Sequence, residues 1–217
     1  LQAARIAAVS VLPLALLWGY GSFQLARYSE HALQTDVPIK VRLVQPSVKQ
    51  RDKWRPEHQR RIFDQHLLLS QTAPDGTNDG ARGVDLIVWP ESAMPFFPLE
   101  QPIALAEIGE MLPSGAWLAA GGLRQERGPD GQRRVFNSLM IYGAGATAQV
   151  AGIYDKIHLV PFGEYLPLQR VLEFSGLQQL SRMRGGFAAG VAPRPYLTLP
   201  KVGRLLPLVC YEVIFPL

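Results

Sequence analysis

The sequence predicts a layered α/β domain preceded by one apolar helix, and three observations support this prediction. The chain has 217 residues, 47% of them hydrophobic, which suits one main domain with its own core. An uncharged apolar run covers residues 6–26. From residue 39 onward, short runs rich in β-branched residues alternate with amphipathic runs, the pattern of strands and helices that pack in layers.

The apolar run predicts a transmembrane helix over residues 1–28. It carries no charge between Arg5 and Arg27, and at about 1.5 Å per residue it reaches about 30 Å, the thickness of the hydrocarbon core of a bilayer. A buried core helix and a signal peptide are the alternatives. The run is long for a signal peptide, however, and it lacks a good cleavage site. The polar stretch at residues 29–38 predicts a linker to the domain that follows.

Strands and helices are predicted to alternate through the first half of that domain. Proline at position 56 suits the first turn of a helix, and apolar residues follow at four-residue spacing. The continuous apolar run before Pro90 indicates a strand buried on both faces. The predicted strands cover residues 39–45, 84–91 and 116–123, and the predicted helices cover residues 55–72 and 103–111.

In the second half, the charged segment 124–134 contains a Gly-Pro-Asp-Gly turn and predicts the long polar tip of a hairpin. The other elements expected are strands at 135–143, 149–159, 196–200 and 204–215, and a helix at 168–180. The last of these strands would place Cys210 in a core sheet only seven residues before the chain ends. We therefore expect residues 39–217 to form a domain that is incomplete at its carboxyl end, and to be inactive or unstable alone.

Composition and spacing argue against several classes of function. A single cysteine excludes an internal disulfide and a multi-cysteine metal cluster. The net charge of +4 would suit nucleic acid, but the basic residues are scattered and not interleaved with aromatic residues. The four histidines show no metal-ligand spacing, and no glycine-rich phosphate loop precedes a helix. We expect no metal, no cofactor and no nucleic-acid partner, and a monomer is favoured.

Three polar groups lie at or near the ends of apolar strand-like runs: Glu91, Lys156 and Cys210. Because strand ends in α/β folds open onto the crevice where ligands bind, these groups could converge. A thiolate is a nucleophile, a nearby glutamate can take its proton, and an ammonium can stabilise an oxyanion. The trio therefore predicts nucleophilic catalysis.

Each group also has a plainer interpretation. A lone cysteine is most often a buried, inert thiol. Glu91 could cap the following turn, and Lys156 could be an ordinary surface charge. A papain-like pair of Cys210 with His158 is a further alternative, but the local sequence expected around such a cysteine is missing.

Three segments, "VWPESAMPF", "YDKIHLVPFGEYLP" and "LVCYEVIFP", resemble the nitrilase (carbon–nitrogen hydrolase) superfamily. Within it, they are most similar to the membrane-bound acyltransferases that complete bacterial lipoprotein maturation. The resemblance covers roughly residues 39–217, and a preceding membrane helix fits the acyltransferases better than soluble amidases. It implies a nitrilase-like α-β-β-α sandwich.

The resemblance implies roles for individual residues. It makes Cys210 the nucleophile, Glu91 the general base and Lys156 the amine that stabilises the oxyanion. Glu164 would orient Lys156 or assist the base, whereas Glu212 could equally be a strand residue in a buried ion pair. The remaining candidates flank the nucleophile or line an apolar substrate opening: Tyr211, Trp54, Met94 and Phe96.

The implied reaction is a two-step acyl transfer from a phospholipid donor to an apolipoprotein acceptor. The sn-1 acyl chain would pass through a thioester on Cys210 to the amino group of a diacylglyceryl-cysteine. The resemblance places this reaction at the bacterial inner membrane, with the catalytic domain on the periplasmic side. Two alternatives remain: an amidase acting on a small C–N substrate, and an inactive membrane-anchored module that binds lipids or lipoproteins.

Overall fold

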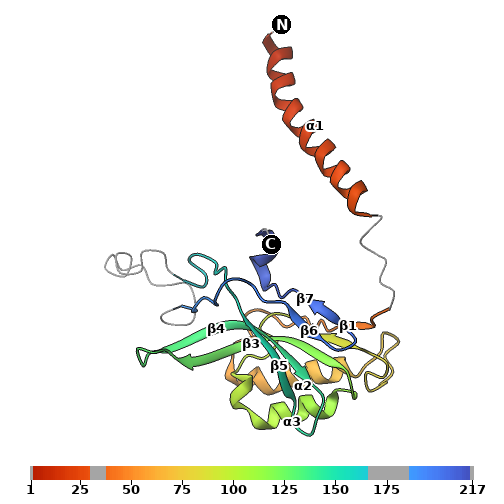
Figure 1. Cartoon of the computed structure of the whole chain (residues 1–217), viewed down its shortest axis with the longest axis vertical. Coiled ribbons are helices and arrows are strands. Elements are labelled where there is room, and N and C mark those ends of the chain that lie inside the picture. The colour runs from red at the N-terminus through yellow and green to blue at the C-terminus, as the bar shows by residue number, and fades with distance from the viewer. Residues whose placement is uncertain (1, 30–37, 166–185, 216–217) are drawn as a thin grey trace. The chain divides into compact units, whose positions relative to one another are not determined.

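The structure, a computed structural model, describes residues 2–29, 38–165 and 186–215. The chain divides into two compact units, Leu1–Pro38 and Ile39–Leu217. The first unit contains a single long helix, α1 (Gln2–Ser29), and the second contains the strands and the shorter helices (Figure 1).

Helix α1 forms where the sequence predicts an apolar helix, and its described side chains include many exposed large apolar ones between residues 11 and 25. Among the residues that the structure describes, no helix has both the length and the apolar content needed to cross a membrane. The predicted transmembrane span is therefore not confirmed. The linker predicted at residues 29–38 lies almost entirely outside the described ranges.

A five-stranded sheet forms the centre of the second unit, with neighbouring strands in chain order. The first three strands run parallel, and each of the last two is antiparallel to the strand before it. Because β4 reverses the direction, β5 points the same way as β2, and the carboxyl ends of β2 and β5 lie at the same edge. The strands are β1 (Val41–Leu43), β2 (Leu86–Val88), β3 (Trp117–Arg127), β4 (Arg133–Gly143) and β5 (Gln149–Asp155).

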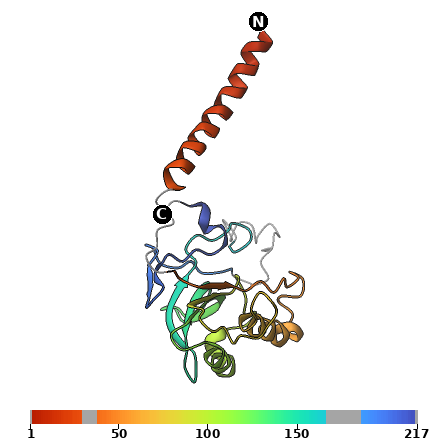
Figure 2. The same ribbon diagram turned by 90° about the vertical axis from the view of Figure 1, so that its right-hand side faces the viewer.

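Helices α2 (Gln59–Ser70) and α3 (Pro102–Met111) cover one face of this sheet (Figures 1 and 2). Short 3-10 turns precede them, η1 (Pro56–His58) and η2 (Pro98–Glu100), and each begins with a proline whose missing N–H costs nothing in a first turn. The main core forms between these helices and the sheet, where Ile87, Ile108 and Leu118 are fully buried. The predicted helices in this half are confirmed.

The opposite face carries a small antiparallel hairpin, β6 (Leu197–Leu199) and β7 (Gly203–Leu205). Leu199 and Val202 pack there against Leu86 and Ile141 of the central sheet. Strand β2 is thus buried on both faces, as its continuous apolar run predicts. Of the four layers expected, the described ranges show one helical layer, the main sheet and this small second sheet.

Two further expectations concern the middle of the chain. The hairpin at 124–134 is confirmed, but β3 and β4 run through most of the charged segment and leave a short turn at residues 128–132. Within this stretch, Arg124 forms an ion pair with Asp155 on β5 and lies over the ring of Phe136. The helix predicted at residues 168–180 lies outside the described ranges.

The strand predicted at residues 204–215 is wrong beyond Leu205. Strand β7 ends there, and residues from Cys210 form a 3-10 helix, η3 (Cys210–Ile214). The apolar run suggested a strand, but Pro207 cannot donate to a ladder, and the carboxylate of Glu212 accepts the backbone N–H of Val209 at 2.9 Å. A glutamate that reaches back in this way winds the chain into a helical turn.

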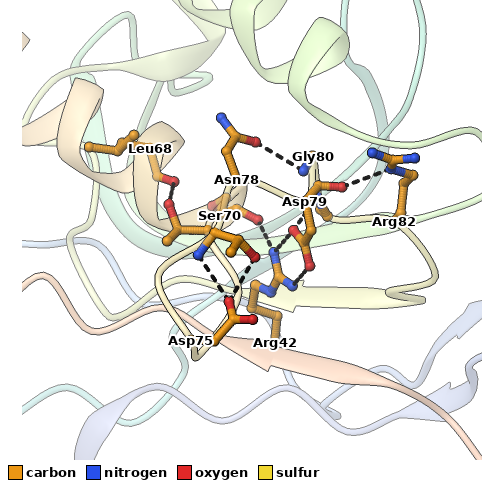
Figure 3. A network of polar contacts seen from close by, with 11 residues as sticks. Arg42, Leu68, Ser70, Asp75, Asn78, Asp79, Gly80 and Arg82 are labelled. Atoms are coloured by element: carbon orange, nitrogen blue, oxygen red, sulfur yellow. Dashed lines mark hydrogen bonds and ion pairs between the residues drawn. The ribbon is translucent and has the colours of Figure 1, made fainter.

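A polar network ties β1 to the loop after α2 (Figure 3). Arg42 makes two hydrogen bonds to Asp79, at 2.9 and 2.6 Å, and a third to the carbonyl of Ser70 at 2.8 Å. Asp79 also accepts the backbone N–H of Ala81 at 2.9 Å. The bidentate pair therefore fixes the loop against the edge strand of the sheet.

This network predicts acid sensitivity. The hydrogen bond from Arg42 is the main cause that lowers the pKa of Asp79 to about 2. A lowered pKa stabilises the fold above the ordinary value of Asp, and this stabilisation is lost as the pH falls through the folded value. Urea unfolding of the wild type should therefore lose stability between about pH 4 and about pH 2 more steeply than unfolding of Arg42→Met. Equal slopes in the two proteins would contradict the prediction.

Candidate active site

The sheet edge at the carboxyl ends of β2 and β5 brings the predicted groups together. Glu91 follows β2, and Lys156 follows β5 directly. The loop that carries Glu91 passes very close to β3: a Cβ on Gly121 would lie 2.8 Å from both the Glu91 Cα and the Ser92 nitrogen. Only glycine permits this approach of two backbones. The position of Glu91 therefore depends on Gly121.

Lys156 is one of the few buried charged side chains of the described residues, with 1% of its surface exposed. Its Nζ lies 2.8 Å from Oε2 of Glu164. Its backbone is fixed on both sides, by hydrogen bonds to the carbonyl of Asn137 at 2.9 Å and from the N–H of Gly190 at 2.8 Å. A buried ammonium needs a paired carboxylate, and Glu164 provides it. The predicted partnership of Lys156 and Glu164 is thus present as an ion pair.

Asn137 on β4 links the two carboxylates, although the sequence interpretation did not include it. Its Nδ2 donates to Oε1 of Glu91 at 2.7 Å and to Oε1 of Glu164 at 3.0 Å. The residue is 4% exposed. One amide nitrogen therefore joins Glu91 to the pair formed by Glu164 and Lys156. The signal in the sequence was a polar Asn-Ser step inside an otherwise apolar strand.

Cys210 is exposed and lies within reach of both Glu91 and Lys156. Burial of the sulfur and the charge of Glu91 raise the pKa of Cys210, whereas the Tyr211 backbone N–H and the charge of Lys156 lower it. The net effect raises the pKa of Cys210, so the resting cysteine is a thiol that lies near the charge of Glu91.

Three residues of this region have a positive φ although they are not glycine: Ser92 at 51°, Phe162 at 63° and Cys210 at 55°. Each is next to or near a residue of the cluster. Such conformations cost energy, and they persist where the surrounding structure holds them in place. Half of the six non-glycine residues with positive φ in the described ranges thus lie near Glu91, Lys156 and Cys210.

Glu212 holds the turn that carries Cys210. It is fully buried, and its Oε1 accepts hydrogen bonds from the Tyr154 hydroxyl at 2.7 Å and from the N–H groups of Ile157 and His158 at 2.9 and 3.1 Å. Arg194 lies 3.6 Å away. Burial opposes ionisation of Glu212, but these donors together outweigh it and lower its pKa. Glu212 thus ties η3 to the segment after Lys156, as a buried charged anchor.

The remaining predicted site residues lie in different surroundings. Met94 is fully buried in the core, so its side chain does not face an opening for substrate. Phe96 is half-buried and packs edge-on against Phe63, with ring centroids 5.6 Å apart. Trp54 is half-buried in a turn, and the side chain of Tyr211 is exposed beside Cys210. Within the described ranges, no group of three potential ligand residues is placed to hold a metal ion.

Residues 40–217 match the sequence pattern of the Carbon-nitrogen hydrolase family. The chain belongs to this family. Its membership accounts for the nitrilase-like α/β arrangement of the second unit. The order of Glu91, Lys156 and Cys210 along the chain, together with their convergence, is also what the resemblance to this family implies.

Comparison with known family members gives closer and more distant similarities. The chain is 42% identical over 199 residues to the apolipoprotein N-acyltransferase of Brucella suis biovar 1 (strain 1330), covering 91% of this chain and 36% of that protein. It is 40% identical over 205 residues to that of Bradyrhizobium diazoefficiens, covering 94% of this chain and 38% of that protein. The chain thus spans somewhat more than a third of the length of these relatives.

Two solved structures are more distant. The NitN amidase from Neterenkonia sp. AN1 is 20% identical, with a TM-score of 0.45, and the alignment covers 82% of this chain and 59% of that one. A carbon-nitrogen hydrolase from Helicobacter pylori G27 is 16% identical, with a TM-score of 0.47, covering 82% of this chain and 53% of that one.

Proposed function

We propose that this chain carries the acyl-transfer site of an apolipoprotein N-acyltransferase. The convergence of a thiol, a carboxylate and a buried ammonium at one sheet edge is the observation that carries the proposal. The identity of about 40% to enzymes of that name supports the substrate class. Cys210 is the nucleophile, Glu91 the general base and Lys156 the stabiliser of the oxyanion.

In the first half-reaction, the sulfur of Cys210 attacks the sn-1 ester carbonyl of a phospholipid while its proton passes to Glu91. The ammonium of Lys156 faces the negative charge that develops on the carbonyl oxygen. When the tetrahedral intermediate collapses, the C–O bond breaks, and the leaving alkoxide takes the proton from Glu91. The products are a thioester on Cys210 and a lysophospholipid.

In the second half-reaction, the free amino group of a diacylglyceryl-cysteine attacks the thioester. Glu91 removes a proton from the amine, the C–S bond breaks, and the proton returns to the sulfur. An amide bond on the lipoprotein replaces the thioester, so the site is restored without any cofactor. Splitting one transfer into two steps lowers each barrier.

The surface around Cys210 suits lipid substrates. Tyr211, Val213 and Ile214 of η3 are 59%, 69% and 67% exposed and present apolar area beside the thiol. Each methylene of an acyl chain gains about 0.8 kcal/mol from burial, so such a chain stays at a lipid surface. We therefore place the protein at the bacterial inner membrane, on the periplasmic side, with the exposed apolar residues of α1 in contact with lipid.

Transfer of a radiolabelled sn-1 acyl chain from phosphatidylethanolamine to a synthetic diacylglyceryl-cysteine peptide tests this function. We expect a labelled amide with the wild-type protein and none with Cys210→Ala. Release of ammonia from small amides without acyl transfer would instead identify an amidase. Absence of both activities in a folded protein would leave only a binding module.

A further inference from the structure

Lys53 is a second amine at this site that the proposed reaction does not use. It lies in the turn before η1, next to Trp54 and far in sequence from Glu91, Lys156 and Cys210. Its Nζ donates a hydrogen bond to the backbone carbonyl of Glu91 at 2.8 Å. Lys49 lies in the same turn, but its side chain is exposed. Lys53 is therefore the lysine of this turn that contacts the proposed base.

The surroundings of Lys53 oppose its positive charge. Burial lowers the pKa of Lys53, and the charge of Glu91 offsets part of this change. The charge of Lys53 in turn reaches His66, a fully buried residue on α2 whose pKa is lowered mainly by burial. Keeping an ammonium in such a place costs free energy unless a nearby negative charge compensates it. Glu91 is that charge.

The charges of the groups around Glu91 balance only when Lys53 is included. Glu164 forms an ion pair with Lys156, so these two charges compensate each other. The carboxylate of Glu91 does not take part in this ion pair. Asn137, which donates a hydrogen bond to it, is neutral. Adding Lys53 brings the cluster to two carboxylates and two ammonium groups. The thiol of Cys210 completes it without a charge.

We propose that Lys53 is a positioning residue that holds the backbone of Glu91 and places a positive charge near its carboxylate, so that this carboxylate is set to accept the proton of Cys210. This inference rests on the proposed function of Glu91 as the base. The charge of Lys53 also affects where the proton goes after Glu91 has accepted it. Once Glu91 is protonated, Lys53 loses its compensating charge, which favours release of the proton to the leaving group.

The groups that face Glu91 come from four elements, and each would influence how readily its carboxylate accepts a proton. They are Lys53 from the turn, Cys210 from η3, Asn137 from β4, and Lys156 acting through Glu164. Of these groups, only Lys53 hydrogen-bonds to the Glu91 backbone and carries a positive charge. The other positive group, Lys156, is paired with Glu164. A variant at this position therefore changes the charge beside the base and leaves the other three groups in place.

The test is the pH profile for alkylation of Cys210 by iodoacetamide, followed by mass spectrometry of the detergent-solubilised full chain. In Lys53→Met we expect the acid limb to move upward by about one pH unit, a roughly tenfold lower rate on that limb, because an adjacent positive charge is lost. Lys53→Arg should stay close to wild type, and Lys49→Met is the matched control. In a Glu91→Gln background, Lys53→Met should cause no shift.

A uniform fall in rate at every pH, accompanied by a lower melting temperature, would assign Lys53 a purely structural role and overturn the inference. An unshifted profile in Lys53→Met would overturn it as well. If the wild type has an acid limb that Glu91→Gln removes, the proposed base survives either of these results. If the wild type has no such limb, the base and the inference fail together.

Discussion

Replacing Lys156 with methionine is expected to lower acyl transfer by about 10²- to 10³-fold, the usual cost of losing one oxyanion donor. Methionine keeps the apolar stem of the buried side chain, so packing is largely preserved. The ammonium, however, no longer faces the developing charge or the thiolate of Cys210. Single-turnover formation of the acyl adduct on Cys210 is the direct measurement.

The same change should also destabilise the fold, because it removes the ion pair between the buried Lys156 ammonium and the carboxylate of Glu164. Breaking a buried pair in this way costs about 3 to 5 kcal/mol. Adding Glu164→Gln removes the carboxylate charge that Lys156 compensated, so the double variant should regain much of the stability and none of the activity. Recovery of activity in the double variant would show that Lys156 acts only as a structural partner.

Replacing Glu212 with alanine is expected to give the largest loss of stability. It would leave four hydrogen-bond donors without their acceptor: the Tyr154 hydroxyl and the N–H groups of Ile157, His158 and Val209. Each donor left unsatisfied inside the protein costs about 1 to 3 kcal/mol, so for four donors we expect a total loss of at least about 4 kcal/mol. Chemical unfolding monitored by tryptophan fluorescence measures it.

Two further variants make the result for Glu212 specific. Glu110→Ala removes an exposed carboxylate and should change stability little. Glu212→Gln keeps the shape and one acceptor oxygen, so it should retain more stability than Glu212→Ala and still react more slowly at Cys210. Because the pKa of Glu212 is lowered in the fold, its contribution should disappear as the pH falls below the ordinary range of a glutamate. Wild-type stability in Glu212→Ala would contradict the anchoring role.

The sequence predicts the sheet well because burial patterns depend on local composition. The apolar run before Glu91 and the strand before Lys156 are found where expected, and their common direction places both residues at one edge. The strand predicted at Cys210 fails for an equally physical reason. Its apolar character was real, but Glu212 winds the chain into a turn by accepting the N–H of Val209, and Glu212 is itself held by Tyr154 and Ile157, more than 50 residues away in the chain.

The supporting residues of the site were harder to foresee. Lys53 has no distinguishing feature in the sequence, since only folding brings its turn against Glu91. Met94 shows the opposite error. Its loop is rich in apolar residues, which suggested an opening for acyl chains. The Met94 side chain is instead fully buried, and its backbone pairs with Gly122 of β3. Composition predicts that such a segment is apolar, and it does not predict which way each side chain points.

The most direct test of the central claim is intact-protein mass spectrometry after incubation with phosphatidylethanolamine and no acceptor. We expect one fatty acyl adduct, mapped to Cys210 by peptide analysis, released by hydroxylamine and by an acceptor peptide, and absent in Cys210→Ala. The adduct should also be strongly reduced in Glu91→Gln. An unmodified Cys210 in a protein that still transfers acyl chains would contradict the account.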